Sequence, residues 1–235
     1  MSTFILIHGA WHGRWCWDEL IPLLEAGKHK VVAIDLPGSG DDPTPPGDVS
    51  LAAYCDAVVH TVCSQGEPVV LVGHSMGGLV ITQVAELIPE RVAALVYVAA
   101  FLPDNGQSLK QLADQGAPLS LEYSADGLTA IIPPQSASDT LFADVHLDIC
   151  KSAVAKLRPQ ALAPLGTPVE TTPERFGSVP RHYVECIRDR AIPIEAQRKM
   201  AAANTCVSIQ SLETGHSPFL SAPAQLANAL LNTTS

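Results

Sequence analysis

The sequence predicts an α/β protein with a mostly parallel, six-stranded, doubly wound sheet. Two observations lead to this prediction: short apolar runs recur along the chain, and stretches of helical length lie between them. Runs that are apolar throughout are typical of parallel strands covered by helices on both faces. The runs that predict strands are residues 4–8, 31–35, 69–73, 94–98, 183–187 and 207–212. Strand and helix in regular alternation predict a doubly wound sheet.

The expected helices have apolar spacing near 3.6 residues, which places their apolar side chains on one face. They cover residues 17–25, 51–63, 76–87, 194–203 and 223–231. Pro223 suits the first turn of the last helix, where a missing N–H does no harm.

The alternation of strand and helix stops between residues 103 and 179. This stretch is rich in proline, at Pro118, Pro133, Pro134, Pro159, Pro164, Pro168 and Pro173. Because a structureless loop of that length is rare inside a compact domain, we expect an inserted cap of short helices and turns. Its clearest helix covers about residues 144–157. Residues 1–102 and 180–235 then form the core, and core and cap make one structural domain.

Composition excludes several classes of function. The chain has 235 residues, of which 47% are hydrophobic and 16% charged, so a large core can be buried. Its formal net charge is −10, which disfavours binding to nucleic acid or to an anionic membrane surface. The N-terminus lacks the basic region of a signal peptide and runs directly into a strand. No apolar run approaches the ~18 residues that cross a bilayer. A cytoplasmic protein is expected.

The segment from Gly73 to Gly78 (GHSMGG) follows a predicted strand and opens a predicted helix. In this context G-x-S-x-G is typical of a nucleophile elbow, a turn so sharp that the flanking positions must be glycine. The alternative is a glycine-rich turn that only packs helix against strand. We predict that Ser75 is a nucleophile exposed beyond the carboxyl end of the sheet.

A serine hydroxyl needs a base to attack an ester. His216 stands in the loop between the last predicted strand and the last helix, which is where the base belongs in the chain order Ser…Asp…His. His74 adjoins the nucleophile and should point away from it.

The acid that orients the base should follow the preceding strand. Asp189 occupies that place, between Arg188 and Arg190, and is the favoured candidate. A solvated aspartate between two arginines is the alternative interpretation. Asp104, after the strand at residues 94–98, is the positional rival.

Backbone N–H groups should stabilise the oxyanion. His8-Gly9-Ala10 follows the first strand, and the glycine lets the chain turn so that the Ala10 N–H faces the site. The Met76 N–H, at the start of the helix after the elbow, supplies the second donor. Such donors are typically worth ~3–4 kcal/mol each.

Three separated segments carry a further signal: residues 8–17 (HGAWHGRWCW), residues 186–193 (CIRDRAIP) with the helix start after them, and residues 157–165 (LRPQALAPL). All three resemble the plant methylesterase and hydroxynitrile lyase branch of the α/β hydrolases. The resemblance covers nearly the whole chain and implies the α/β-hydrolase fold. It also implies hydrolysis of small methyl, alkyl or aryl carboxylic esters through an acyl-enzyme. We expect a bacterial esterase of this branch.

Two positions depart from the branch. Its hydroxynitrile lyases carry a lysine after the catalytic histidine, where this chain has Ser217, so cyanohydrin cleavage is disfavoured. The residue after Ala10 is commonly small in the plant enzymes and is Trp11 here. We expect Trp11 to shape an apolar substrate pocket with Phe142, Leu147 and Ile149 from the cap.

The sequence therefore predicts a serine carboxylesterase that requires no metal and no organic cofactor. Its expected partners are an ester and water, with no nucleic acid and no membrane; homodimer formation is left open. The alternatives are a lyase or C–C hydrolase with the same catalytic residues, and a small-molecule binder without turnover.

Overall fold

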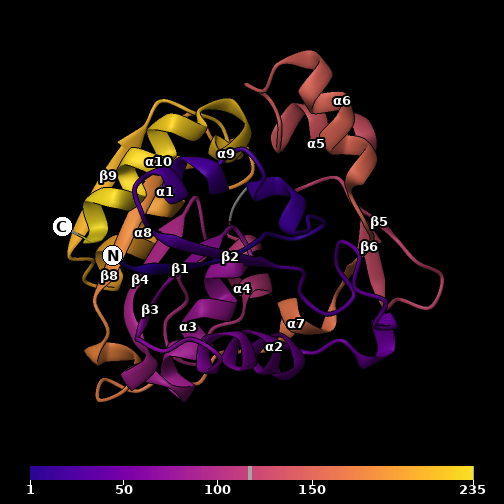
Figure 1. The fold of residues 1–235 in the computed structure, drawn as a ribbon. Coiled ribbons are helices and arrows are strands. Elements are labelled where there is room, and N and C mark those ends of the chain that lie inside the picture. The colour runs from indigo at the N-terminus through magenta and orange to yellow at the C-terminus, as the bar shows by residue number, and fades with distance from the viewer. Residues whose placement is uncertain (116–117, 235) are drawn as a thin grey trace.

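A computed structural model describes residues 1–115 and 118–234. Its main sheet has six strands in the order β2-β1-β3-β4-β8-β9, and every neighbouring pair is parallel (Figure 1). The strands are β1 (Thr3–Ile7), β2 (Lys30–Ile34), β3 (Val69–His74), β4 (Val92–Val98), β8 (Arg181–Cys186) and β9 (Ser208–Leu212). The predicted fold class is confirmed, and each predicted strand begins and ends within two residues of the observed one.

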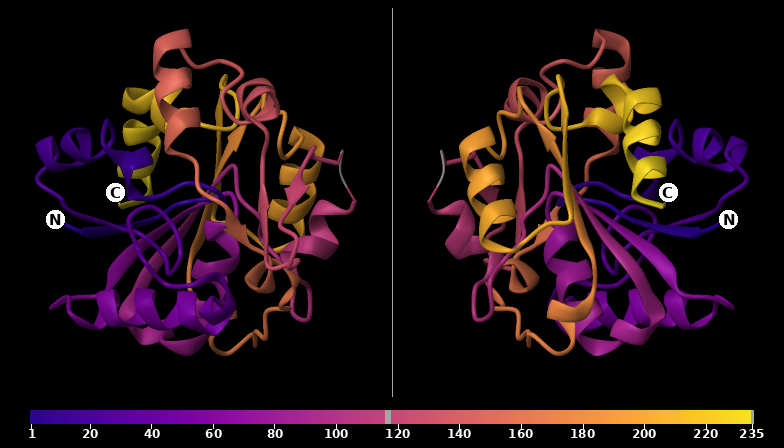
Figure 2. Two further views of the ribbon diagram at one scale, coloured as in Figure 1. Left: turned by 90° about the vertical axis from the view of Figure 1, so that its right-hand side faces the viewer. Right: turned by 90° about the vertical axis from the view of Figure 1, so that its left-hand side faces the viewer.

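Helices cover both faces of this sheet (Figure 2). Side chains alternate along a strand, and in β1 Phe4 and Leu6 pack on one face while Ile5 and Ile7 pack on the other. The first face is covered by α1 (Ile21–Ala26) and α10 (Pro223–Leu231). The second is covered by α2 (Leu51–Cys63), α3 (Gly77–Leu87) and α8 (Ile194–Ala203). Burial on both faces explains why the strands read as continuous apolar runs.

The helices α2, α8 and α10 begin and end where the sequence predicts. The first predicted helix differs, because a 3-10 turn at Arg14–Trp17 and the helix α1 replace a single helix over residues 17–25. Pro22 stands in the first turn of α1. A proline has no N–H to donate to the carbonyl four residues before it, so Pro22 fits only in the first turn of a helix and a single helix cannot run from residue 17 through it.

The segment between β4 and β8 contains more than the expected helices and turns. It holds α4 (Leu109–Ala113), α5 (Pro134–Thr140), α6 (Leu147–Lys156) and α7 (Ala163–Gly166), and also three strands, β5 (Glu122–Tyr123), β6 (Thr129–Ile131) and β7 (Gln160–Ala161). These strands form an antiparallel sheet of their own. Strands of two or three residues are too short to show a period of two, so the sequence prediction was incomplete here. The predicted helix at residues 144–157 is the shorter α6.

The remaining elements are short. They are the 3-10 turns Pro46–Asp48, Pro89–Arg91, Phe176–Ser178 and Asn232–Thr234, and the helix α9 (Pro218–Ser221). Within residues 1–115 and 118–234, no helix has both the length and the apolar character needed to traverse a bilayer.

Hydrogen bonds anchor the segment between β4 and β8 to the loop after β1. The Gln160 side chain accepts from the Trp11 N–H at 3.2 Å and donates to the Tyr54 hydroxyl at 3.0 Å. The Trp11 indole N–H donates to the Ala130 carbonyl at 3.0 Å, and the Arg158 N–H donates to the Trp11 carbonyl at 2.9 Å. Because Gln160 is almost fully buried, its two hydrogen bonds are shielded from water and hold this segment against the loop after β1 and against α2.

Candidate active site

Ser75 lies on a strained turn between β3 and α3. Its φ is 52°, in the left-handed region that a residue with a side chain rarely adopts. A Cβ atom at Gly73 would lie 2.6 Å from the Gly77 carbonyl oxygen, and one at Gly77 would lie 2.6 Å from the Ile7 carbonyl oxygen. Both contacts are too short for real atoms, so the turn requires glycine on each side of Ser75. This geometry is that of a nucleophile elbow.

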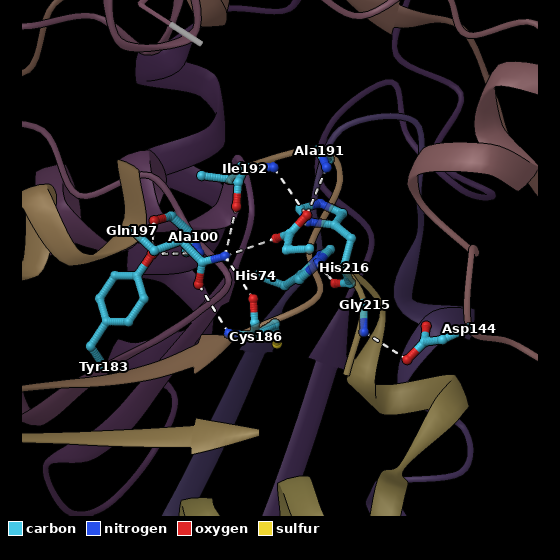
Figure 3. Close-up of polar contacts among 11 residues, drawn as sticks. His74, Ala100, Asp144, Tyr183, Cys186, Ala191, Ile192, Gln197, Gly215 and His216 are labelled. Atoms are coloured by element: carbon cyan, nitrogen blue, oxygen red, sulfur yellow. Dashed lines mark hydrogen bonds and ion pairs between the residues drawn. The ribbon is translucent and has the colours of Figure 1, made fainter. Parts of the chain in front are cut away.

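Asp189 and His216 form a buried pair. His216 Nδ1 and Asp189 Oδ2 are 2.8 Å apart, and their side chains are 2% and 0% exposed. Asp189 Oδ1 accepts from the backbone N–H groups of Ala191 and Ile192, at 2.7 and 3.0 Å (Figure 3). Since a carboxylate only accepts, Nδ1 of His216 carries the proton in this bond. The other nitrogen, Nε2, is then free to act as a base.

Gln197, for which the sequence predicts no role, makes hydrogen bonds to several groups around Asp189. Its side chain is fully buried. Its Nε2 donates to Asp189 Oδ2 at 3.1 Å and to the Ile192 carbonyl at 2.7 Å, and its Oε1 accepts from the Cys186 N–H at 3.1 Å. Gln197 is on α8, eight residues after the acid, and no local pattern in the sequence signals the contact.

Asp104, the other candidate acid, has a different hydrogen-bond partner. It is exposed, and its Oδ1 accepts a hydrogen bond from Asn204 Nδ2 at 3.0 Å. Across the described residues, it makes no hydrogen bond with His216. The geometry therefore favours Asp189 as the partner of the base.

Ser75 and His216 line the same cavity. Within the described part of the chain, the Ser75 hydroxyl makes no hydrogen bond with His216. In ligand-free enzymes the bond between nucleophile and base is often long and tightens when substrate binds. The arrangement is compatible with a nucleophile and base that engage on a bound ester.

The expected oxyanion donors are free in this structure. Among residues 1–115 and 118–234, neither the Ala10 N–H nor the Met76 N–H donates to a protein acceptor. The Gly9 carbonyl accepts from His8 Nδ1 at 2.8 Å and from the His12 N–H at 3.3 Å. This carbonyl and the Ala10 N–H belong to one trans peptide plane and point in opposite directions. Holding the carbonyl therefore fixes the direction of the Ala10 N–H.

Three further histidines around the site are buried. His8 accepts from the Leu36 N–H at Nε2, His12 donates from Nδ1 to the Ala10 carbonyl, and His74 donates from Nε2 to the His216 carbonyl at 2.9 Å. Burial lowers the pKa of each, to about 3 for His12. They are neutral at ordinary pH and orient backbone groups. The His74 ring lies against the His216 ring, with the ring centroids 4.6 Å apart, and so restricts movement of the His216 imidazole.

The cavity in front of Ser75 has a volume of about 860 Å³ and a mostly apolar lining. Ala10, Trp11, Met76 and His216 line it together with Ser75. Apolar side chains supply much of the rest, among them Phe101, Leu102, Leu109, Leu119, Leu121, Leu141, Leu162, Leu165, Ile192 and Met200. The charged side chains of the lining are exposed and so lie toward the opening; they are Asp104, Lys110, Asp114, Glu195 and Lys199.

Of the four residues expected to shape the pocket, Trp11 lines this cavity and the other three lie outside its lining. Phe142 is buried, but its ring packs edge-on against His12. Leu147 and Ile149 are 62% and 45% exposed on α6. The prediction for these three residues rested on their apolar character. The cavity is instead formed by α4, α7, α8 and the chain around them.

Comparison with known proteins places this geometry in a family. The model of the alpha/beta hydrolase family matches residues 4–229. Methylesterase 1 of Arabidopsis thaliana is 33% identical over 97% of this chain and 94% of that protein. Salicylic acid-binding protein 2 of Nicotiana tabacum is 32% identical over 97% of this chain and 95% of that protein. The chain belongs to the alpha/beta hydrolase family.

Solved structures agree with this assignment. The crystal structure of polyneuridine aldehyde esterase matches with a TM-score of 0.91 and 27% identity, covering 100% of both chains. A pyrethroid hydrolase from Sphingobium faniae JZ-2 matches with a TM-score of 0.88 and 28% identity, covering 98% of this chain and 96% of that one. Within the family, the resemblance to methylesterases that the sequence suggested is therefore confirmed.

Proposed function

We propose that this protein is a serine carboxylesterase in which Ser75 is the nucleophile, His216 the base and Asp189 the acid that orients it. The observation that carries the proposal is the buried 2.8 Å contact between Asp189 and His216, at a cavity that also contains Ser75. The esterase names of the relatives support the same activity. A binder without turnover would not need this orientation of the base.

The reaction follows from the geometry. His216 Nε2 takes the Ser75 proton as the hydroxyl oxygen attacks the ester carbonyl, and Asp189 stabilises the imidazolium that forms. The Ala10 and Met76 N–H groups receive the oxyanion. The proton then passes from His216 to the leaving alcohol, and an acyl group remains on Ser75. Water, deprotonated by His216, attacks the acyl group and releases the acid.

The cavity favours esters with an apolar acyl or aryl group. At about 860 Å³ it lies in the upper range of pockets for drug-sized ligands. Each buried methylene contributes roughly 0.8 kcal/mol. We therefore expect kcat/KM to rise at least tenfold from p-nitrophenyl acetate to p-nitrophenyl octanoate. A preference for the acetate would contradict this part of the proposal.

Hydrolysis is favoured over cyanohydrin cleavage. Ser217 is fully buried after the base and offers a hydroxyl dipole where a departing cyanide needs a positive charge. The lysines of the lining, Lys110 and Lys199, are exposed. The purified protein should be offered methyl salicylate, mandelonitrile and acetone cyanohydrin at equal concentration. We expect ester cleavage with little cyanide release; cyanide release with equal or higher kcat/KM would overturn the assignment.

The proposal extends to the setting of the enzyme. Residues 103–179 act as a cap over the core formed by residues 1–102 and 180–235. The protein is a cytoplasmic, bacterial enzyme. It has no nucleic-acid partner, and the net charge of −10 supports this last point. Whether it forms a homodimer is decided by light scattering or analytical ultracentrifugation.

A further inference from the structure

A single carboxylate of the segment between β4 and β8 reaches the loop that carries the base. Asp144 lies between α5 and α6, and its Oδ2 accepts a hydrogen bond from the Gly215 N–H at 2.6 Å (Figure 3). The two residues are 71 positions apart in the sequence. In the sequence, Gly215 directly precedes His216, so the contact is one residue from the base.

The second carboxylate oxygen of Asp144 also lies close to Gly215. Oδ1 is buried and has no hydrogen-bond partner among the described residues. A Cβ atom at Gly215 would lie 2.6 Å from it, which is too close for real atoms. The carboxylate therefore rests directly on the backbone of residue 215, and it fits there because that residue is glycine. A charged acceptor makes a stronger hydrogen bond to N–H than a neutral one.

The other contacts of this loop come from the core. Arg188 N–H donates to the Thr214 carbonyl at 2.9 Å, His74 Nε2 donates to the His216 carbonyl, and Asp189 holds the His216 ring. In the part of the chain that the structure describes, Asp144 is the only residue of 103–179 with a hydrogen bond to residues 213–217. Core residues thus hold the ring and the carbonyl of His216, and Asp144 holds the backbone N–H of the residue before it.

We propose that Asp144 is a positioning residue for His216. By holding the Gly215 N–H, it fixes the backbone from which the imidazole projects and aims Nε2 at the Ser75 hydroxyl. Asp144 is not part of the cavity lining, so it acts through His216 and not on the substrate. This inference rests on the proposed function, in which His216 is the base. A displacement of about 1 Å in a catalytic group can lower a rate by ~100-fold.

The test compares Asp144→Ala with Asp144→Asn. The alanine variant should lower kcat about 10- to 100-fold and leave KM within about twofold, because the cavity lining is unchanged. The asparagine variant retains an acceptor oxygen and should recover kcat to within about threefold of wild type. Asp148→Ala, an exposed carboxylate of α6, is the matched control and should behave as wild type.

Two results would overturn the proposal: a folded Asp144→Ala protein with wild-type kcat, or an asparagine variant as slow as the alanine variant. Should Asp144→Ala not fold, Gly215→Ala serves instead, because its Cβ displaces the carboxylate. It should lower kcat with KM unchanged, and wild-type kcat would contradict the proposal.

Labelling of Ser75 by a fluorophosphonate separates this proposal from the esterase assignment. The reagent reports an activated serine even where ester turnover is absent. If wild type labels readily but hydrolyses no ester, the esterase assignment fails. Slower labelling of Asp144→Ala than of wild type would still support the positioning role, and equal rates would reject it.

Discussion

The loops of the core and the segment between β4 and β8 differ in how their structure is encoded. In the core, Ser75, Asp189 and His216 each follow a strand of the main sheet, and the strand order brings those strand ends to one edge. In the segment at residues 103–179, short strands pair across long separations, and the cavity wall comes from several distant pieces. Local geometry determines the first region, and tertiary packing determines the second. Substitutions in the core loops, and at Asp144 which holds the backbone next to His216, should therefore change kcat. Substitutions in the cavity wall should change substrate preference.

The largest expected effect separates the two candidate acids. Asp189→Asn should lower kcat by roughly 10⁴-fold, because an amide favours the wrong imidazole tautomer. Asp104→Asn, an exposed residue on the rim of the cavity, should change kcat less than about twofold. Steady-state kinetics on one p-nitrophenyl ester measures both. Reversed effects would move the acid to the loop after β4.

The proposed catalytic residues could be predicted from the sequence because each carries a local signal. Gly73 and Gly77 must be glycine for the turn at Ser75, and His216 stands in a short loop between the last strand and the last helices. Gln197 and Asp144 carry no such signal, since their partners are defined only when α8 and the segment between β4 and β8 pack on the rest of the chain. The same holds for the pocket, where the apolar character of Leu147 and Ile149 did not reveal that α6 exposes them to solvent.

Gln197 provides a test of the core network at intermediate size. Gln197→Leu preserves volume but leaves the Cys186 N–H and the Ile192 carbonyl without their side-chain partner. Each unsatisfied buried group costs roughly 1–3 kcal/mol, so the free energy of unfolding should fall by about 3 kcal/mol. The kcat should also fall, because Asp189 loses one donor. Urea unfolding together with kinetics would reveal both; an unchanged unfolding free energy would contradict the network.

A smaller effect concerns pH and the buried histidine His12. Burial lowers its pKa in the folded state to about 3, below the ordinary value of 6.5. Between those values the unfolded chain binds more protons, so stability is present above pH 6.5 and is lost as pH falls toward 3. This histidine contributes at most about 1.4 kcal/mol per pH unit. His12→Asn should therefore show a shallower loss of stability than wild type in urea unfolding at pH 7, 6 and 5. Equal slopes would show that His12 is not held neutral.

The smallest expected effect is at an exposed residue of α6. Ile149→Ala removes an exposed side chain outside the cavity lining and should leave kcat and KM within about twofold of wild type. Ile192→Ala removes a buried side chain that lines the cavity, and its lost transfer free energy predicts roughly a tenfold higher KM. A larger KM effect at Ile149 than at Ile192 would place the pocket beneath α6.

The most direct test of the central claim is covalent labelling of the nucleophile. A fluorophosphonate should add once per chain, and peptide mapping by mass spectrometry should place the adduct on Ser75. Ser75→Ala should take up no label, and His216→Ala should be labelled at least 100-fold more slowly, because the serine has lost its base. An adduct on another residue, or undiminished labelling of Ser75→Ala, would contradict the assignment of Ser75 as the nucleophile.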